Sequence, residues 1–102
     1  MAEGQWTDVE LAATVVAYRR IQELEIRGVE YSKTAIRDEV IDSLFLRRTA
    51  GSYEYRMQNI SAVLDELGQP WIEGYKPARN VGEAVRVRLG LMLDAIRPGG
   101  LI

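Results

Sequence analysis

Residues 47–60 read RRTAGSYEYRMQNI, a tight basic turn that leads into a helix. The apolar side chains of this helix recur at three- and four-residue steps and form an anchoring stripe: Met57, Ile60, Val63, Leu64 and Leu67. Its other side carries arginine, glutamine, asparagine, tyrosine and serine, which suit phosphate groups and base edges. A helix of this kind is typical of helix-turn-helix proteins, so the stretch predicts a helical fold that binds nucleic acid.

Two helices are predicted before this stretch. The first covers about 7–27, because Thr7-Asp8-Val9-Glu10 fits a capping box and Gly28 suits the position just after a helix. Apolar residues along it recur at helical spacing. The second helix is expected over about 33–44, after an N-cap at Ser32.

The helix of the opening stretch and one further helix complete the set. The former is expected to take Ser52 as its N-cap and to end before Gly68. Residues 70–77 contain two prolines, a glycine and two aromatic residues, which favour an extended arm or one short strand. The last helix is expected to open at a capping box, Asn80-Val81-Gly82-Glu83, and to stop before Pro98.

The expected fold is therefore all-α, a small domain of four helices in which the second and third form a helix-turn-helix. A winged variant, with a small sheet around the extended arm, is the alternative. Residues 1–97 are expected to form one helical DNA-binding domain, and residues 98–102 a linker-like tail. Because Pro98-Gly99-Gly100 suits a linker, we expect the chain to continue into a longer protein.

Composition narrows the range of functions. The 102 residues contain no cysteine and no histidine, which excludes disulfides, thiolate zinc sites and imidazole bases within them. We expect no catalysis by these residues alone, and neither a metal nor a cofactor. No apolar run approaches the roughly 20 residues that span a bilayer, and the N-terminus lacks a secretion signal, so a cytoplasmic protein is expected. The net charge of −2 weighs against nucleic acid, although residues 47–60 and 76–102 are locally basic.

The candidate DNA contacts are of two kinds. Cations that suit phosphates gather at the turn, at the helix start and beside Pro77: Arg47, Arg48, Arg56, Lys76 and Arg79. Side chains placed to face a groove, or a phosphate at the helix start, are Tyr55, Gln58, Asn59 and Ser52. Helical spacing puts Tyr53 in the core and Tyr55 outward. For Asn59 two interpretations stay open: contact with a base edge, or burial with its amide satisfying the backbone of the turn that precedes the helix.

Three blocks of the sequence carry a resemblance to a known family. They are RTAGS at 48–52, QNISAVLDELG at 58–68 and GYKP at 74–77. Together they resemble the N-terminal domain of bacterial HNH-type restriction endonucleases, including modification-dependent ones, and of related defence proteins. Glu54 matches the family pattern, whereas Arg56 stands where the family has lysine. The opening Trp6-Thr7-x-x-Glu10 also fits, so the resemblance spans residues 6–77.

The resemblance implies a module that interacts with DNA and accompanies a nuclease or another effector. The HNH catalytic residues of the family have no counterpart in this histidine-free chain. The expected function is therefore a DNA-binding recognition or positioning domain, with double-stranded DNA and an effector domain or partner protein as its partners. The alternative is a helical protein-interaction or dimerisation module that docks an effector or pairs as a homodimer. An apolar surface around Leu91, Leu93 and Trp71 would serve that role.

Overall fold

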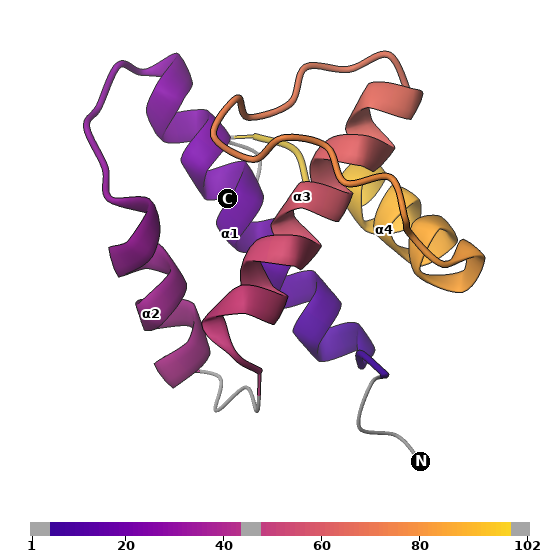
Figure 1. Ribbon diagram of the computed structural model, residues 1–102. Coiled ribbons are helices and arrows are strands. Elements are labelled where there is room, and N and C mark those ends of the chain that lie inside the picture. Colours follow the sequence, from indigo (N-terminus) through magenta and orange to yellow (C-terminus); the bar gives the residue numbers. More distant parts are fainter. Residues whose placement is uncertain (1–4, 44–47, 99–102) are drawn as a thin grey trace.

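The computed structural model describes residues 5–43 and 48–98, which form four helices (Figure 1). These helices are α1 (Asp8–Ile26), α2 (Lys33–Ser43), α3 (Ala50–Glu66) and α4 (Glu83–Ala95). The prediction of an all-α fold with four helices is confirmed. No strand occurs within the described ranges, so the winged alternative does not hold for them. The turn between α2 and α3 falls mostly on residues 44–47, outside the described residues.

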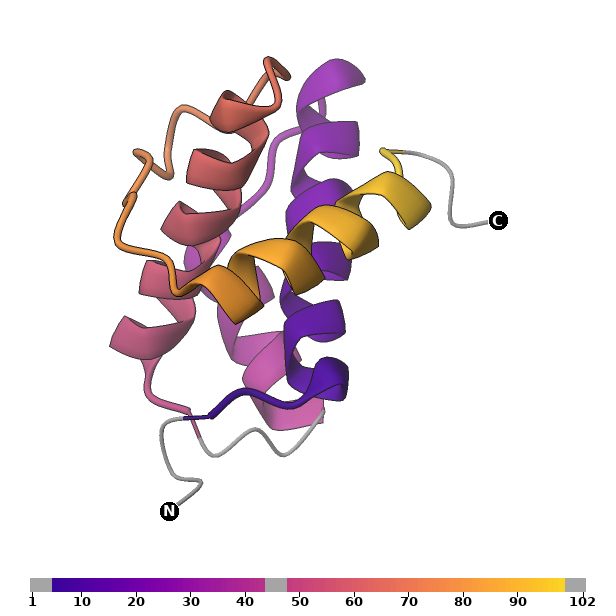
Figure 2. The ribbon, with the colours of Figure 1, turned by 90° about the vertical axis from the view of Figure 1, so that its right-hand side faces the viewer.

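Within the described part of the chain, helices α1 and α3 each contact the other three helices, whereas α2 and α4 do not contact each other. Figures 1 and 2 show α2 and α3 along one side of α1 and α4 crossing behind α3. The buried face of α1 is the predicted apolar stripe, which includes Leu11, Val15, Tyr18 and Ile21. The stripe of α3 is buried as predicted from Met57 to Leu64. The last residue assigned to that stripe, Leu67, is 53% exposed, because α3 ends at Glu66 and Leu67 is its C-cap.

Four of the predicted helix ends are confirmed by their hydrogen bonds and dihedral angles. The Thr7 hydroxyl accepts from the Glu10 N–H at 3.1 Å, and the Glu10 carboxylate accepts from the Thr7 N–H at 3.0 Å. After α1 and α3, Gly28 and Gly68 have φ angles of 70° and 71°, a conformation that glycine adopts without strain. The Ser32 hydroxyl accepts from the Ala35 N–H at 3.1 Å and caps α2.

Two predicted caps are wrong. Thr49 is the N-cap of α3, since its hydroxyl accepts from the Ser52 N–H at 3.0 Å. Ser52 lies inside the first turn, where its own hydroxyl donates to the Thr49 carbonyl. Helix α4 has Gly82 as its N-cap and no side-chain cap. Asn80 lies two residues before that N-cap, and its carbonyl oxygen accepts a hydrogen bond from Tyr55 on α3.

The segment that joins α3 to α4 has no regular secondary structure, yet it is firmly attached to the helices. We call residues 74–80 the strap, because they run across the outer side of α3 (Figure 1). The Ala78 N–H donates to the Gln58 carbonyl at 3.1 Å, and Lys33 on α2 donates to the Gly74 carbonyl at 2.8 Å. Tyr75 is 1% exposed and anchors the strap in the core. The predicted extended arm therefore packs on the protein.

Arg19 is a buried cation, 3% exposed, that fixes the end of α4. Its guanidinium donates to the carbonyls of Ile96 at 2.7 Å and Leu93 at 2.8 Å, and to the Gln22 side chain at 2.6 Å. Burial lowers the pKa of this guanidinium. The last carbonyls of a helix lack partners within the helix, so Arg19 satisfies two of them and ties α4 to α1.

Candidate nucleic-acid interface

Asn59 lies inside the protein and does not face a groove. It is 0% exposed, and its Nδ2 donates to the Ala78 carbonyl of the strap at 2.7 Å. Its Oδ1 accepts from Arg56 Nη1 at 2.9 Å. The interpretation of Asn59 as a base contact is therefore wrong. The other interpretation is nearer the structure, with the difference that the satisfied backbone belongs to the strap and not to the turn.

Two of the predicted phosphate contacts, Arg48 and Arg56, are engaged within the protein. Their guanidinium carbons lie 4.5 and 4.7 Å from the centre of the Trp6 ring. Arg48 also donates to both oxygens of Glu10, at 3.1 and 2.9 Å, and to the Gln5 carbonyl. Burial lowers the pKa of Arg56, and the neighbouring positive charge of Arg48 lowers it further. These two arginines attach the N-terminal segment to the start of α3. They are therefore not exposed for the phosphate contacts that were predicted for them.

Arg88 on α4 reaches the same cluster, although the sequence did not single it out as a contact residue. Its Nη2 donates to the Trp6 carbonyl at 2.7 Å, and its guanidinium pairs with Asp8 at 2.8 Å. Three guanidinium groups therefore surround Trp6, and Glu10 and Asp8 are the carboxylates bonded to them. The cluster joins the start of α1 to both α3 and α4.

The remaining predicted contacts are open to solvent to different degrees. Tyr55 is 40% exposed on the outer side of α3, which confirms its predicted orientation, and Tyr53 is buried as predicted. Gln58 and Ser52 are half-buried, and Lys76 and Arg79 are exposed on the strap. Arg47 lies outside the described residues. The open part of the predicted site is thus Tyr55, Gln58, Lys76 and Arg79, with Ser52 at the start of α3.

The two strap cations can bind phosphate at low cost to the rest of the protein. Within the described ranges, Lys76 has no ion pair. Arg79 pairs with Asp65 at 2.6 Å, and its hydrogen bond lowers the pKa of that carboxyl. The side chains of Arg79 and Asp65 are 56% and 41% exposed, and exposed ion pairs of this kind contribute little to stability. A phosphate can therefore compete with Asp65 for Arg79.

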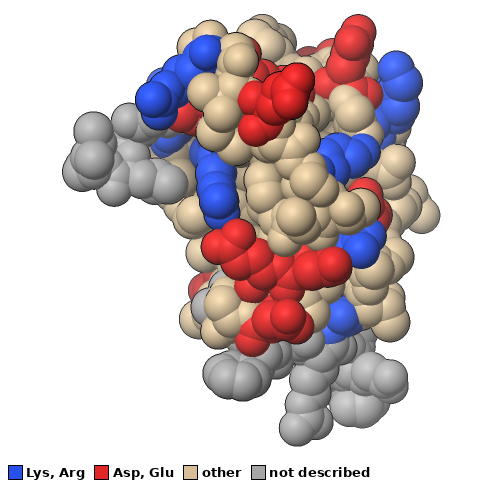
Figure 3. All heavy atoms as spheres, turned by 90° about the vertical axis from the view of Figure 1, so that its left-hand side faces the viewer, with Lys and Arg blue, Asp and Glu red and all other residues tan. Residues whose placement is uncertain are grey.

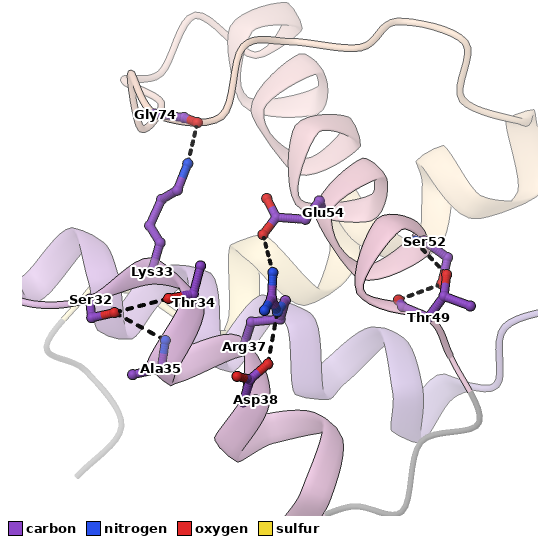
Figure 4. A network of polar contacts seen from close by, with 10 residues as sticks. All are labelled: Ser32, Lys33, Thr34, Ala35, Arg37, Asp38, Thr49, Ser52, Glu54 and Gly74. Atoms are coloured by element: carbon purple, nitrogen blue, oxygen red, sulfur yellow. Dashed lines mark hydrogen bonds and ion pairs between the residues drawn. The ribbon is translucent and has the colours of Figure 1, made fainter.

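Helix α2 offers DNA an unfavourable surface. Asp38, Glu39 and Asp42 are exposed on it, and acidic atoms form a band across this side of the molecule in Figure 3. The cations of α2 are bonded within the protein (Figure 4). Arg37 donates to Asp38 at 2.9 Å and to Glu54 of α3 at 3.4 Å, and Lys33 donates to the strap. The candidate interface is therefore the first turns of α3 together with the strap, without α2.

No protein-family model, no curated protein and no solved structure matches this chain. The structure shows where the blocks that carry the family resemblance lie. Residues 59–64, in the middle of the longest block, are all buried, and so is Tyr75 in the last block. The buried residues of these blocks serve packing, whereas Lys76 in the last block is exposed.

Neither a cluster that could bind a metal ion nor a helix that could span a membrane occurs among the described residues. Within residues 5–43 and 48–98, no three acidic side chains gather closely enough to hold a metal ion. None of the helices in these ranges combines the length and the apolar character needed to cross a bilayer. What the site offers chemically is thus a set of cations, a phenol and a carboxamide held on a fixed backbone.

Proposed function

We propose that the chain binds double-stranded DNA through the first turns of α3 and the strap, as the recognition or positioning domain of a restriction-type or defence protein in the cytoplasm. The observation that carries this proposal is the exposure of Lys76 and Arg79 on a strap that is hydrogen-bonded to α3. These cations suit phosphates on one strand, which would set the position of the helix on the duplex. The resemblance of residues 6–77 to HNH-type restriction endonucleases supports the same function.

The positions of the groove-facing groups follow from the attachment of the strap. The Tyr55 hydroxyl donates to the Asn80 carbonyl at 3.2 Å, which keeps the phenol beside the strap cations. Gln58 is half-buried next to it, and a carboxamide can pair with an adenine edge. The N-terminus of α3 adds partial positive charge close to this face. The backbone that carries these groups needs little ordering on binding, because hydrogen bonds already hold the strap to α3.

The test compares two double variants that remove the same charge. Lys76→Ala with Arg79→Ala should weaken binding to a mixed-sequence duplex at least about tenfold and lower the salt slope by up to about 2, since each lost phosphate contact contributes roughly 0.9. Arg20→Ala with Arg27→Ala is the matched control, because both side chains are exposed on α1 or its C-cap. Fluorescence anisotropy over a range of salt concentrations measures both quantities. Equal losses in the two pairs, or no binding by the wild type, would overturn the proposal.

A second candidate function, a protein-interaction module, is favoured by one specific observation. Val87 and Leu91 on the outer side of α4 are 51% and 69% exposed. Of the residues first assigned to such a surface, Leu93 is 1% exposed and belongs to the core, and Trp71 is half-buried. Light scattering together with a duplex-binding measurement separates the two functions. An assembly that forms without any affinity for duplex favours the interaction module.

A further inference from the structure

The outer side of α4 is an apolar surface with two hollows. One hollow, of about 480 Å³, lies between α3 and α4, and its apolar lining comes from Val63, Leu67, Val87 and Leu91. The other, of about 360 Å³, lies between α1 and α4 and includes Val9, Leu91 and Met92. Because Leu91 lines both hollows, they form one continuous surface, which we call the α4 face. Large exposed apolar surfaces of this kind mark interaction sites.

Packing among residues 5–43 and 48–98 does not explain Gly90, at the centre of the α4 face. A Cβ atom at Gly90 would meet nothing within 4 Å, so packing inside the molecule does not require glycine there. Glycine in the middle of a helix lowers stability relative to alanine. What glycine does allow is the close approach of another backbone. A second helix packed across α4 at this point would use that property.

The charges beside Gly90 indicate that the second helix is α4 of another copy of this chain. Glu83 and Arg97 stand seven positions on either side of Gly90, and Arg86 and Asp94 stand four positions on either side. In an antiparallel pair of α4 helices that cross at Gly90, Glu83 lies beside the C-terminal end of the second copy's α4, which Arg97 follows two residues after Ala95. Arg86 then lies opposite the Asp94 of the second copy. A parallel pair would instead place like charges opposite each other, so the pattern is self-complementary only in the antiparallel arrangement.

We propose that a second copy of this chain packs its α4 antiparallel against the first, about a two-fold axis that passes near Gly90. Leu91 of each copy enters the hollow between α3 and α4 of the other. Glu83 and the Asp94–Arg97 pair are exposed and available for this exchange, with Arg86 3.6 Å from Glu83 and Arg97 3.0 Å from Asp94. Arg86 is held more closely, because it also pairs with Glu66 of α3 at 2.8 Å beside the same hollow. This inference does not depend on DNA binding, since the strap cations lie outside the α4 face.

The first test changes Leu91, whose exposure means that the fold does not depend on it. Sedimentation velocity over a concentration series should show a wild-type dimer, and Leu91→Glu should raise its dissociation constant by roughly tenfold or more. Ile26→Glu is the matched control, because Ile26 is 73% exposed and lies outside the α4 face. It should change the dissociation constant by less than about twofold. Gly90→Ala should weaken the dimer while the melting temperature of the monomer stays level or rises, which separates a lost contact from a lost fold.

The second test uses charge reversal to identify the antiparallel arrangement. Glu83→Lys and Arg97→Glu should each weaken self-association, because each places like charges opposite each other in the dimer. An equimolar mixture of the two variants should form a heterodimer in which both pairs are again of opposite sign. A monomeric wild type, equal effects of Leu91→Glu and Ile26→Glu, or a mixture that stays monomeric would overturn the inference. A wild-type protein that is monomeric but still binds duplex DNA would overturn the inference of a dimer and leave the proposed function intact.

Discussion

At the scale of single residues, Glu10 has two structural roles. One carboxylate oxygen accepts from the Thr7 N–H and completes the capping box of α1. The same carboxylate accepts two hydrogen bonds from Arg48, which holds the Trp6 cluster together. The bond from Arg48 is the main reason that the pKa of Glu10 lies below its ordinary value of 4.5. A carboxyl with a lowered pKa in the folded state makes stability depend on pH.

The first prediction concerns acid unfolding. Because folding lowers the pKa of Glu10, its contribution is fully present above the ordinary value of 4.5 and is lost as the pH falls through the folded-state value. Glu10→Gln should therefore lower the melting temperature at pH 7 by about 5 °C, and the difference should shrink toward pH 3. Thermal unfolding by circular dichroism between pH 7 and pH 3 measures this. Glu73→Gln, at an exposed strap-proximal position, is the control. A gap between wild type and Glu10→Gln that is constant with pH would contradict the assignment.

At the scale of elements, the sequence predicts what local chemistry decides. The capping box at Thr7, the cap at Ser32 and the glycines after α1 and α3 each act within a few residues, and all were found where predicted. The start of α3 was harder, because Thr49 and Ser52 are both good N-caps three positions apart. Which of the two residues caps α3 depends on the direction from which the preceding chain enters the helix. The residues around the cap do not determine that direction.

The second prediction tests that assignment. Thr49→Ala should destabilise the protein by about 1 kcal/mol, because the Ser52 N–H at the first turn loses its acceptor. Ser52→Ala should cost less than about 0.5 kcal/mol, since its hydroxyl only donates to a carbonyl near the surface. Urea denaturation with a common slope measures both differences. A larger loss from Ser52→Ala than from Thr49→Ala would return the cap to Ser52.

At the scale of the whole molecule, the site could be predicted only in part. Helical spacing alone distinguishes Tyr53 from Tyr55, because both orientations follow from the apolar stripe of α3. The burial of Asn59 depends on Ala78, which comes 19 residues later in the strap. The engagement of Arg48 depends on Glu10, 38 residues earlier. Because of such contacts between distant segments, residues of a type that suits DNA stabilise the fold instead. The sequence pattern of a single helix does not reveal these contacts.

The last prediction follows from the place of Asn59 between three parts of the fold. Its amide donates to the strap, its carbonyl oxygen accepts from Arg56, and Arg56 lies over Trp6. Asn59→Ala removes both hydrogen bonds and leaves the carbonyl of half-buried Ala78 and the half-buried Arg56 cation without these partners. The expected loss is about 1–3 kcal/mol of unfolding free energy.

Gln58→Ala is the matched control for Asn59→Ala, because Gln58 is the adjacent carboxamide and holds the strap through its backbone carbonyl alone. This change should cost less than about 0.5 kcal/mol. Hydrogen exchange at the Ala78 amide reports on the strap directly, since that N–H donates to the Gln58 carbonyl. Asn59→Ala should speed this exchange relative to the α1 core, whereas Gln58→Ala should leave it close to wild type. Equal protection of the Ala78 amide in both variants would mean that the strap is held by Tyr75 and the core, and that Asn59 contributes no attachment of its own.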